Sequence, residues 1–201
     1  MRLAVFDCDG TLVDSQHSIV ASMFAAFDAH AQPRPDAEAV RHVVGLPLRE
    51  AIARLIPDGA TADCGRLETS YVEAFRALRR AGGVDDPLYP GALDVLAVLE
   101  ASGWVLGVAT GKSSRGLVAT LEAHGLTKRF RTLQTADKGP GKPNPDMLLN
   151  AMTETGAEPA NTVMIGDTTF DMEMARRAGA VAIGVSWGYH PEERLHSAGA
   201  H

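Results

Sequence analysis

Cysteine and long apolar runs are nearly absent from this sequence. Its 201 residues include two cysteines, Cys8 and Cys64, which lie far apart and form neither a disulfide framework nor a zinc-binding pattern. No stretch of about 18 apolar residues occurs, so we expect no membrane-spanning helix. The apolar stretch before Asp7 is too short for the core of a signal peptide, and we therefore expect a cytoplasmic protein.

Positive charge is also in short supply. The chain has 19 lysines and arginines against 25 aspartates and glutamates, which gives a net charge of -6 at pH 7. Nucleic acids and anionic membranes select for basic surfaces, so neither is expected as the main partner. The 45% of hydrophobic residues is ordinary for a globular protein, and the length suits one domain or a core domain with a smaller insertion.

Short apolar runs that alternate with helical patterns predict the fold class. The predicted strands are residues 3–6, 105–109, 162–165 and 180–185, with 131–135 as a weaker candidate. Helical periodicity occurs between them, at residues 92–101, 116–124 and 145–155. This alternation indicates an α/β fold with a doubly wound, Rossmann-like parallel sheet.

Residues 15–81 break the alternation. Helical patterns occur there at residues 19–30, 48–56 and 67–80, without a strand pattern. Glycines and prolines follow at residues 82–91, as expected where a chain leaves one structural unit for another. We therefore predict a core domain of residues 1–14 and 82–201, with residues 15–81 inserted as an all-helical domain.

Two carboxylates follow the first predicted strand. Asp7 and Asp9 are two residues apart in an extended backbone, so both side chains point to one side while Cys8 points away into the packing. One carboxylate can attack phosphorus while the other moves a proton. An ordinary polar turn is the alternative, and Gly10 favours the functional interpretation only modestly.

A candidate phosphate loop follows the run 105–109. Thr110 and Gly111 precede a helix N-terminus, an arrangement suited to a phosphate group. A simple helix cap by Ser113 or Ser114 explains the same pattern, and Lys112 is expected in solvent.

A lysine lies at another predicted helix start. Pro143 favours an extended backbone at Lys142, and Asn144 is expected to cap a helix that begins at Pro145. Lys142 would then be held where it can offset negative charge, although a solvated lysine is equally compatible with this segment.

Two further carboxylates follow the run 162–165. Asp167 comes directly after it, and Asp171 lies four residues on, in the first turn of the next predicted helix. Carboxylates that converge at the end of a strand suit Mg²⁺. A favourable interaction with the helix dipole is the alternative.

The four segments together resemble the haloacid dehalogenase superfamily. In chain order they are D-x-D-G-T-L from Asp7, the strand-ending Thr110, the Lys142-Pro143 pair and G-D-x-x-x-D ending at Asp171. The resemblance covers nearly the whole chain, and the runs 45–50 and 87–91 resemble phosphoglycolate-phosphatase-like members. It implies that residues 15–81 are a helical cap of the first cap subclass.

The resemblance also implies roles for the carboxylates. Asp7 would attack the phosphoryl group and form an aspartyl-phosphate. Asp9 would protonate the leaving alcohol and then deprotonate the hydrolytic water. Mg²⁺ would be held by the carboxylates of Asp7 and Asp167 and by the backbone carbonyl of Asp9.

The remaining site residues are assigned in the same way. Thr110 and the Gly111 amide would bind the phosphate, Lys142 would steady the charge of the nucleophile, and Asp171 would support Lys142. Arg49, in the predicted cap, is a candidate to meet a substrate carboxylate or second phosphate, and a solvated arginine is the alternative.

The implied activity is hydrolysis of a small phosphorylated metabolite, phosphoglycolate-like or a sugar phosphate. An acid at Asp9 argues against a dehalogenase, and the absence of lysine before Lys112 argues against a phosphonoacetaldehyde hydrolase. A phosphomutase of the same superfamily shares all four motifs. A receiver-like phospho-accepting protein is a more distant alternative. Neither the leaving group nor the oligomeric state is predicted, and His190 is expected at the surface.

Overall fold

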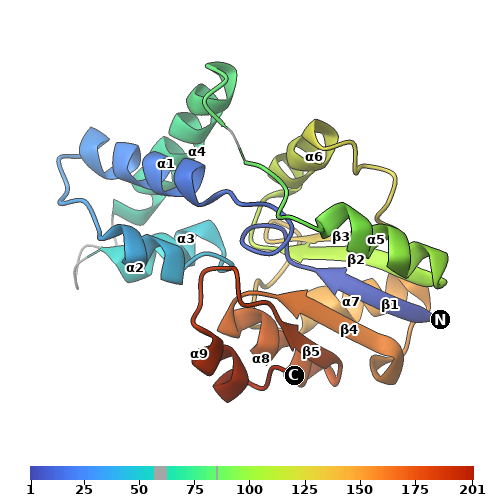
Figure 1. Ribbon diagram of the computed structural model, residues 1–201. Coiled ribbons are helices and arrows are strands. Elements are labelled where there is room, and N and C mark those ends of the chain that lie inside the picture. Colours follow the sequence, from blue (N-terminus) through green and yellow to red (C-terminus); the bar gives the residue numbers. More distant parts are fainter. Residues whose placement is uncertain (57–62, 85) are drawn as a thin grey trace.

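A five-stranded parallel sheet forms the centre of the molecule. The computed structural model describes residues 1–56, 63–84 and 86–201, and its strand order is β3-β2-β1-β4-β5 (Figure 1). The strands are β1 Arg2–Phe6, β2 Trp104–Thr110, β3 Thr132–Thr135, β4 Thr162–Gly166 and β5 Val181–Gly184. All five predicted strands are therefore present. The strand order reverses between β1 and β4, and ligands of such sheets bind outside the carboxyl ends of the strands at that point.

Helices cover both faces of the sheet, which confirms the doubly wound α/β fold (Figure 1). Their bounds are α5 Ala92–Ala101, α6 Ser114–Ala123, α7 Asp146–Thr155, α8 Thr169–Ala178 and α9 Glu192–Ala198. Successive residues of a strand point to opposite faces. Ala4 and Phe6 of β1 accordingly pack in the cluster that includes α5 and α6 side chains. Leu3 and Val5 pack in the cluster built on α7 and α8.

Four helices stand apart from these layers. They are α1 Gln16–Ala29, α2 Ala37–His42, α3 Leu48–Leu55 and α4 Cys64–Arg80, and we call them the α1–α4 segment. Their apolar side chains, among them Phe27, Ile52 and Leu67, form a buried cluster of their own, which includes no residue of the sheet or of helices α5 to α9. No strand occurs in the described residues of this segment. Helix α2 was not predicted, because six residues are too few to establish a helical period.

The helix starts near the sheet edge differ slightly from the prediction. Helix α7 begins at Asp146 instead of Pro145, and the Asn144 side chain accepts a hydrogen bond from the Asp146 N–H at 2.9 Å. Ser113 caps α6 by accepting a bond from the Gly116 N–H, as one of the two proposed caps. Among the residues described, no helix is both long and apolar enough to cross a membrane.

Candidate active site

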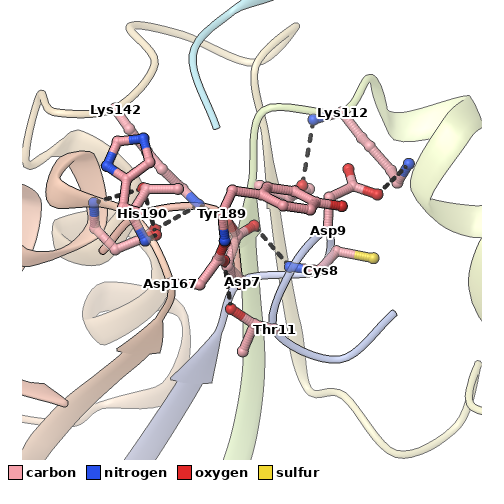
Figure 2. Close-up of polar contacts among 12 residues, drawn as sticks. Asp7, Cys8, Asp9, Thr11, Lys112, Lys142, Asp167, Tyr189 and His190 are labelled. Carbon is pink, nitrogen blue, oxygen red and sulfur yellow. Dashed lines mark hydrogen bonds and ion pairs between the residues drawn. The ribbon is translucent and has the colours of Figure 1, made fainter. Parts of the chain in front are cut away.

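Asp7 lies at the carboxyl end of the central strand and is paired with a buried lysine. Its backbone N–H continues the ladder by donating to Ile165 O at 2.9 Å, so the side chain emerges at the edge between β1 and β4. Lys142 Nζ lies 2.8 Å from Asp7 Oδ2 and 2.6 Å from Asp171 Oδ1 (Figure 2). All three side chains are at most 1% exposed. One ammonium therefore serves two carboxylates in a water-excluded layer, and Lys142 is not solvated.

Asp171 is held by the start of helix α8. Its Oδ2 accepts hydrogen bonds from the Thr168 N–H at 3.1 Å and from Thr168 Oγ1 at 2.6 Å, and the Asp171 N–H donates to Thr168 Oγ1 at 3.3 Å, which completes a capping box. Since Lys142 contacts the other oxygen, both oxygens of Asp171 are engaged by protein groups. Asp171 therefore connects Lys142 to the start of helix α8.

Asp167 is fixed by donors from two distant loops. Thr11 Oγ1 donates to its Oδ1 at 2.8 Å, and the Tyr189 N–H donates to its Oδ2 at 2.9 Å (Figure 2). The carboxylate also packs directly against Gly10, where a Cβ would overlap it and where φ is +80°. Only glycine meets both requirements, so steric space and backbone conformation together explain why position 10 needs a glycine, which the sequence motif alone did not reveal.

The buried carboxylates repel one another. Burial raises the pKa of Asp7 to about 7; Lys142 lowers it and Asp171 raises it further. Burial, followed by the charges of Asp7 and Asp171, raises the pKa of Asp167 well above its usual range. Ligand atoms of these three aspartates lie within 4.8 Å of one another. Three carboxylates against one ammonium leave a deficit of two positive charges, which a hard divalent cation such as Mg²⁺ fits.

Asp9 belongs to a second polar cluster on the other side of Asp7. Its Oδ1 accepts a short hydrogen bond from Ser15 Oγ and lies 2.8 Å from Lys112 Nζ (Figure 2). The Lys112 side chain is only 12% exposed, so the expectation of a solvated lysine was wrong. Pairing with the Asp9 carboxylate offsets the cost in free energy of removing the Lys112 ammonium from water. Cys8, as predicted, points into the packed core and is fully buried.

The candidate phosphate loop contacts the α1–α4 segment. Thr110 is buried, and its Oγ1 accepts a hydrogen bond from the Lys112 N–H at 3.2 Å. A Cβ at Gly111 would lie 2.8 Å from Leu46 O and 2.9 Å from Gly45 O. Glycine at position 111 thus lets the turn before α3 approach the loop closely, and any side chain there would push the two apart.

A cavity of about 730 Å³ lies between this loop and the α1–α4 segment. Asp7, Asp9, Thr110 and Gly111 line it, whereas Lys142, Asp167 and Asp171 form the buried layer beyond Asp7. The cavity therefore joins most of the predicted site residues. Arg49 of α3 lines the same cavity from the opposite side.

His190 was expected at the surface, and this was wrong. The side chain is 3% exposed and lies between the core and His42 of helix α2. Its Nδ1 accepts a hydrogen bond from the Thr169 N–H at 3.1 Å, and its Nε2 then carries the proton donated to His42 O at 3.0 Å. Burial lowers the pKa of His190 to about 4, so the ring is neutral.

Sequence reasoning missed several residues that build the site. Ser15, Tyr189 and His190 come from segments that no local motif joins to Asp7 or Asp167, and only the fold brings them together. Thr11 was quoted inside the first motif without a role. Lys112 did carry a signal, because it follows the same strand end as Thr110.

The fold and the buried carboxylate–lysine cluster together define an α/β enzyme with its site at the carboxyl ends of the strands. The chain belongs to the haloacid dehalogenase-like hydrolase family, whose family model matches residues 4–185. A solved structure of a hydrolase from Pseudomonas syringae is 28% identical, with a TM-score of 0.85, and the match covers 100% of this chain and 91% of that one.

Curated relatives bear phosphatase names. The probable phosphatase IndB of Dickeya dadantii is 38% identical over 98% of this chain and 86% of that protein. The N-acetylmuramic acid 6-phosphate phosphatase of Pseudomonas aeruginosa is 32% identical over 96% of this chain and 85% of its own length. The phosphoglycolate phosphatase of Agrobacterium fabrum is 32% identical over 93% of this chain and 81% of that protein. The predictions of this family and of a phosphoric monoester hydrolase are confirmed.

Proposed function

We propose that the protein is a Mg²⁺-dependent phosphatase that hydrolyses a small phosphomonoester through an aspartyl-phosphate on Asp7. The observation that carries this proposal is the position of Asp7, which lines the cavity on one side and contacts the buried Lys142 on the other. A carboxylate so placed can reach a substrate while its charge is offset from behind.

Asp7 acts as the nucleophile in this proposal. Lys142 favours the charged form of the carboxylate, because it lowers the pKa that burial raises. The hydrogen bond from the Cys8 N–H to Asp7 Oδ1, 2.6 Å long, fixes the orientation of the carboxylate. Attack on phosphorus would form the bond between an Asp7 oxygen and phosphorus while the bond to the leaving oxygen breaks.

Asp7 and Asp167, with the backbone carbonyl of Asp9, would hold the metal. Bound Mg²⁺ supplies the positive charge that lets an anionic phosphate approach the carboxylates. The surplus of negative charge in the buried layer and the convergence of its carboxylate oxygens support this ligand set. Asp171 is left out because its two oxygens link the Lys142 ammonium to the capping box of helix α8, which gives it a different role.

Asp9, Thr110 and Gly111 complete the proposed machinery. Asp9 would give a proton to the leaving oxygen and later take one from the water that hydrolyses the aspartyl-phosphate. Thr110 Oγ1 and the Gly111 N–H would donate to the phosphate oxygens from the start of the loop before α6. Their shared exposure to one cavity supports this division of roles.

The α1–α4 segment would act as the cap over the site. Residues 15–81 would form this domain and residues 1–14 and 82–201 the core. Three apolar clusters that each lie within one of these units support the division, and a smaller cluster around Phe170 joins them. Arg49 would meet an anionic or polar group of the substrate from the cap side. The names of the relatives suggest a phosphoglycolate-like or sugar phosphate ester, and a cavity of about 730 Å³ has room for the larger of these.

The test is phosphate release from a panel of small phosphomonoesters by the wild type and by Asp7→Asn, with Mg²⁺ and with a chelator. We expect turnover only in the wild type with Mg²⁺, and the ranking of esters then identifies the leaving group. Transfer of the phosphoryl group to another position on the substrate, without release, would mean a phosphomutase. No reaction with any ester by a folded wild type would contradict the proposal.

A further inference from the structure

Lys112 joins the candidate proton-transfer group to the α1–α4 segment. Its Nζ lies 2.8 Å from Asp9 Oδ1 and 5.6 Å from the centre of the Phe75 ring. Asp9 belongs to the core, whereas Phe75 belongs to helix α4. Figure 2 shows Lys112 and Asp9 on one side of Asp7, with Lys142 and Asp167 on the other. The two lysines therefore serve different carboxylates, and only Lys142 has a role in the proposed function.

The position of Lys112 is built into the loop after β2. Its N–H donates to Thr110 Oγ1 at 3.2 Å, and its carbonyl accepts a bond from the Ala136 N–H at 3.1 Å. Burial acts to lower the pKa of the lysine, but Asp9 and its neighbours outweigh burial and raise it, so the ammonium stays charged. A charged amine so little exposed needs partners, and the carboxylate and the aromatic ring are of the right kind.

Asp9 is held by only one of its two oxygens. Both Ser15 Oγ and Lys112 Nζ contact Oδ1. Within the described residues, no protein donor contacts Oδ2, and Asp9 lines the cavity. The carboxylate is thus oriented by one oxygen and has the other available for a proton.

We propose that Lys112 is a positioning residue for Asp9, and that the Phe75 ring holds Lys112 in place from the α1–α4 segment. This rests on the proposed function. As the bond from phosphorus to the leaving oxygen breaks, its electron pair stays on that oxygen. The proton of Asp9 Oδ2 moves to the same oxygen, and the carboxylate left behind is paired with Lys112. Displacing α4 would loosen Lys112 and misplace the proton donor.

The test compares two esters that differ in their need for a proton. The oxygen of para-nitrophenyl phosphate leaves as a stable anion, whereas that of an alkyl phosphate such as glycerol phosphate must be protonated. General acid catalysis contributes about 10²–10⁴-fold, so we expect Lys112→Met to lower kcat/KM, which reports the phosphoryl-transfer step, about 10–100-fold for the alkyl ester and under about 3-fold for the nitrophenyl ester. A fall in kcat shared by both esters is also expected, because Asp9 serves the hydrolysis of the aspartyl-phosphate that both esters form. Lys128→Met, at an exposed lysine, is the matched control.

A double mutant tests the part played by Phe75. Phe75→Leu should give a smaller loss of the same selectivity, and Lys112→Met/Phe75→Leu should be no worse than Lys112→Met, because the ring acts through the lysine. An equal loss of kcat/KM on both esters would overturn the positioning role. Additive losses would overturn the role of Phe75. Turnover of the nitrophenyl ester by each variant shows that the variant is folded. If the wild type hydrolysed neither ester, the proposed function would be refuted, and the result would be distinguishable from a loss confined to the variants.

Discussion

Removing Lys142 should destabilise the protein strongly. The Lys142→Met substitution keeps an apolar chain of similar length but leaves Asp7 and Asp171 without the ammonium that contacts both at 2.8 and 2.6 Å. Breaking a buried ion pair by removing one partner costs about 3–5 kcal/mol. This is a large share of the roughly 5–15 kcal/mol that stabilises a typical native protein. We expect a loss in this range in the free energy of unfolding measured by urea titration without divalent metal.

The loss should depend on pH in a defined direction. The pKa of Asp7 is already raised to about 7, and without Lys142, which lowers it, it should rise further. A carboxyl whose pKa is raised by folding loses native-state stability as the pH rises from its unfolded pKa to its folded pKa, so the loss ends near pH 7 in the wild type and continues above it in the variant. The difference between wild type and variant should therefore be larger at about pH 8 than at about pH 6, where Asp7 can bind a proton.

A second substitution makes the reasoning testable even if the single variant is marginal. Lys142→Met/Asp7→Asn removes one of the two uncompensated charges and should recover about 1–3 kcal/mol relative to Lys142→Met. Lys128→Met, on the surface, should stay within about 0.5 kcal/mol of the wild type. A loss below about 1 kcal/mol in Lys142→Met, or a double variant no more stable than the single one, would refute the account of the buried cluster.

Three further outcomes are expected. Folding lowers the pKa of His190 to about 4, so the free energy of unfolding of the wild type should fall by up to about 3 kcal/mol as the pH drops from 6.5 to 4. The His190→Gln variant can make both hydrogen bonds but cannot titrate, and unfolding titrations should show that it lacks this loss. Gly10→Ala combines a φ of +80° with overlap on Asp167, so calorimetry should show a loss above about 2 kcal/mol. Mg²⁺ should raise the Tm of the wild type, and Asp167→Asn should reduce that rise; an equal rise in both would exclude Asp167 as a ligand.

The sheet and its surrounding helices could be read from the sequence because their signals are local. Each strand is a short apolar run, and each helix between strands has its own period. The alternation predicts a parallel sheet but not its strand order, in which β1 pairs with both β2 and β4. Helix α2 was missed because six residues carry no clear helical period. The start of α7 was predicted one residue early, because both Pro145 and Asp146 are suitable first residues of a helix.

The site could be predicted only as far as its motifs extend. The motifs name Asp7, Asp167 and Lys142, and the structure brings these residues together. The partners that hold the carboxylates are different, since Tyr189 reaches Asp167 from the loop after β5. Burial of Lys112 likewise depends on helix α4, which no motif connects to the loop after β2. Long-range packing of this kind leaves no pattern in one sequence.

The measurement that tests the central claim most directly is chemical trapping of the phosphorylated Asp7. The Asp9→Asn variant should still accept the phosphoryl group from para-nitrophenyl phosphate, which needs no proton donor, but should hydrolyse the intermediate slowly. Rapid quenching and borohydride reduction would convert an aspartyl-phosphate to homoserine. We expect homoserine at position 7 by peptide mass spectrometry, only with ester and Mg²⁺ present. Release of nitrophenol with an unmodified Asp7, or modification at another carboxylate, would contradict the account.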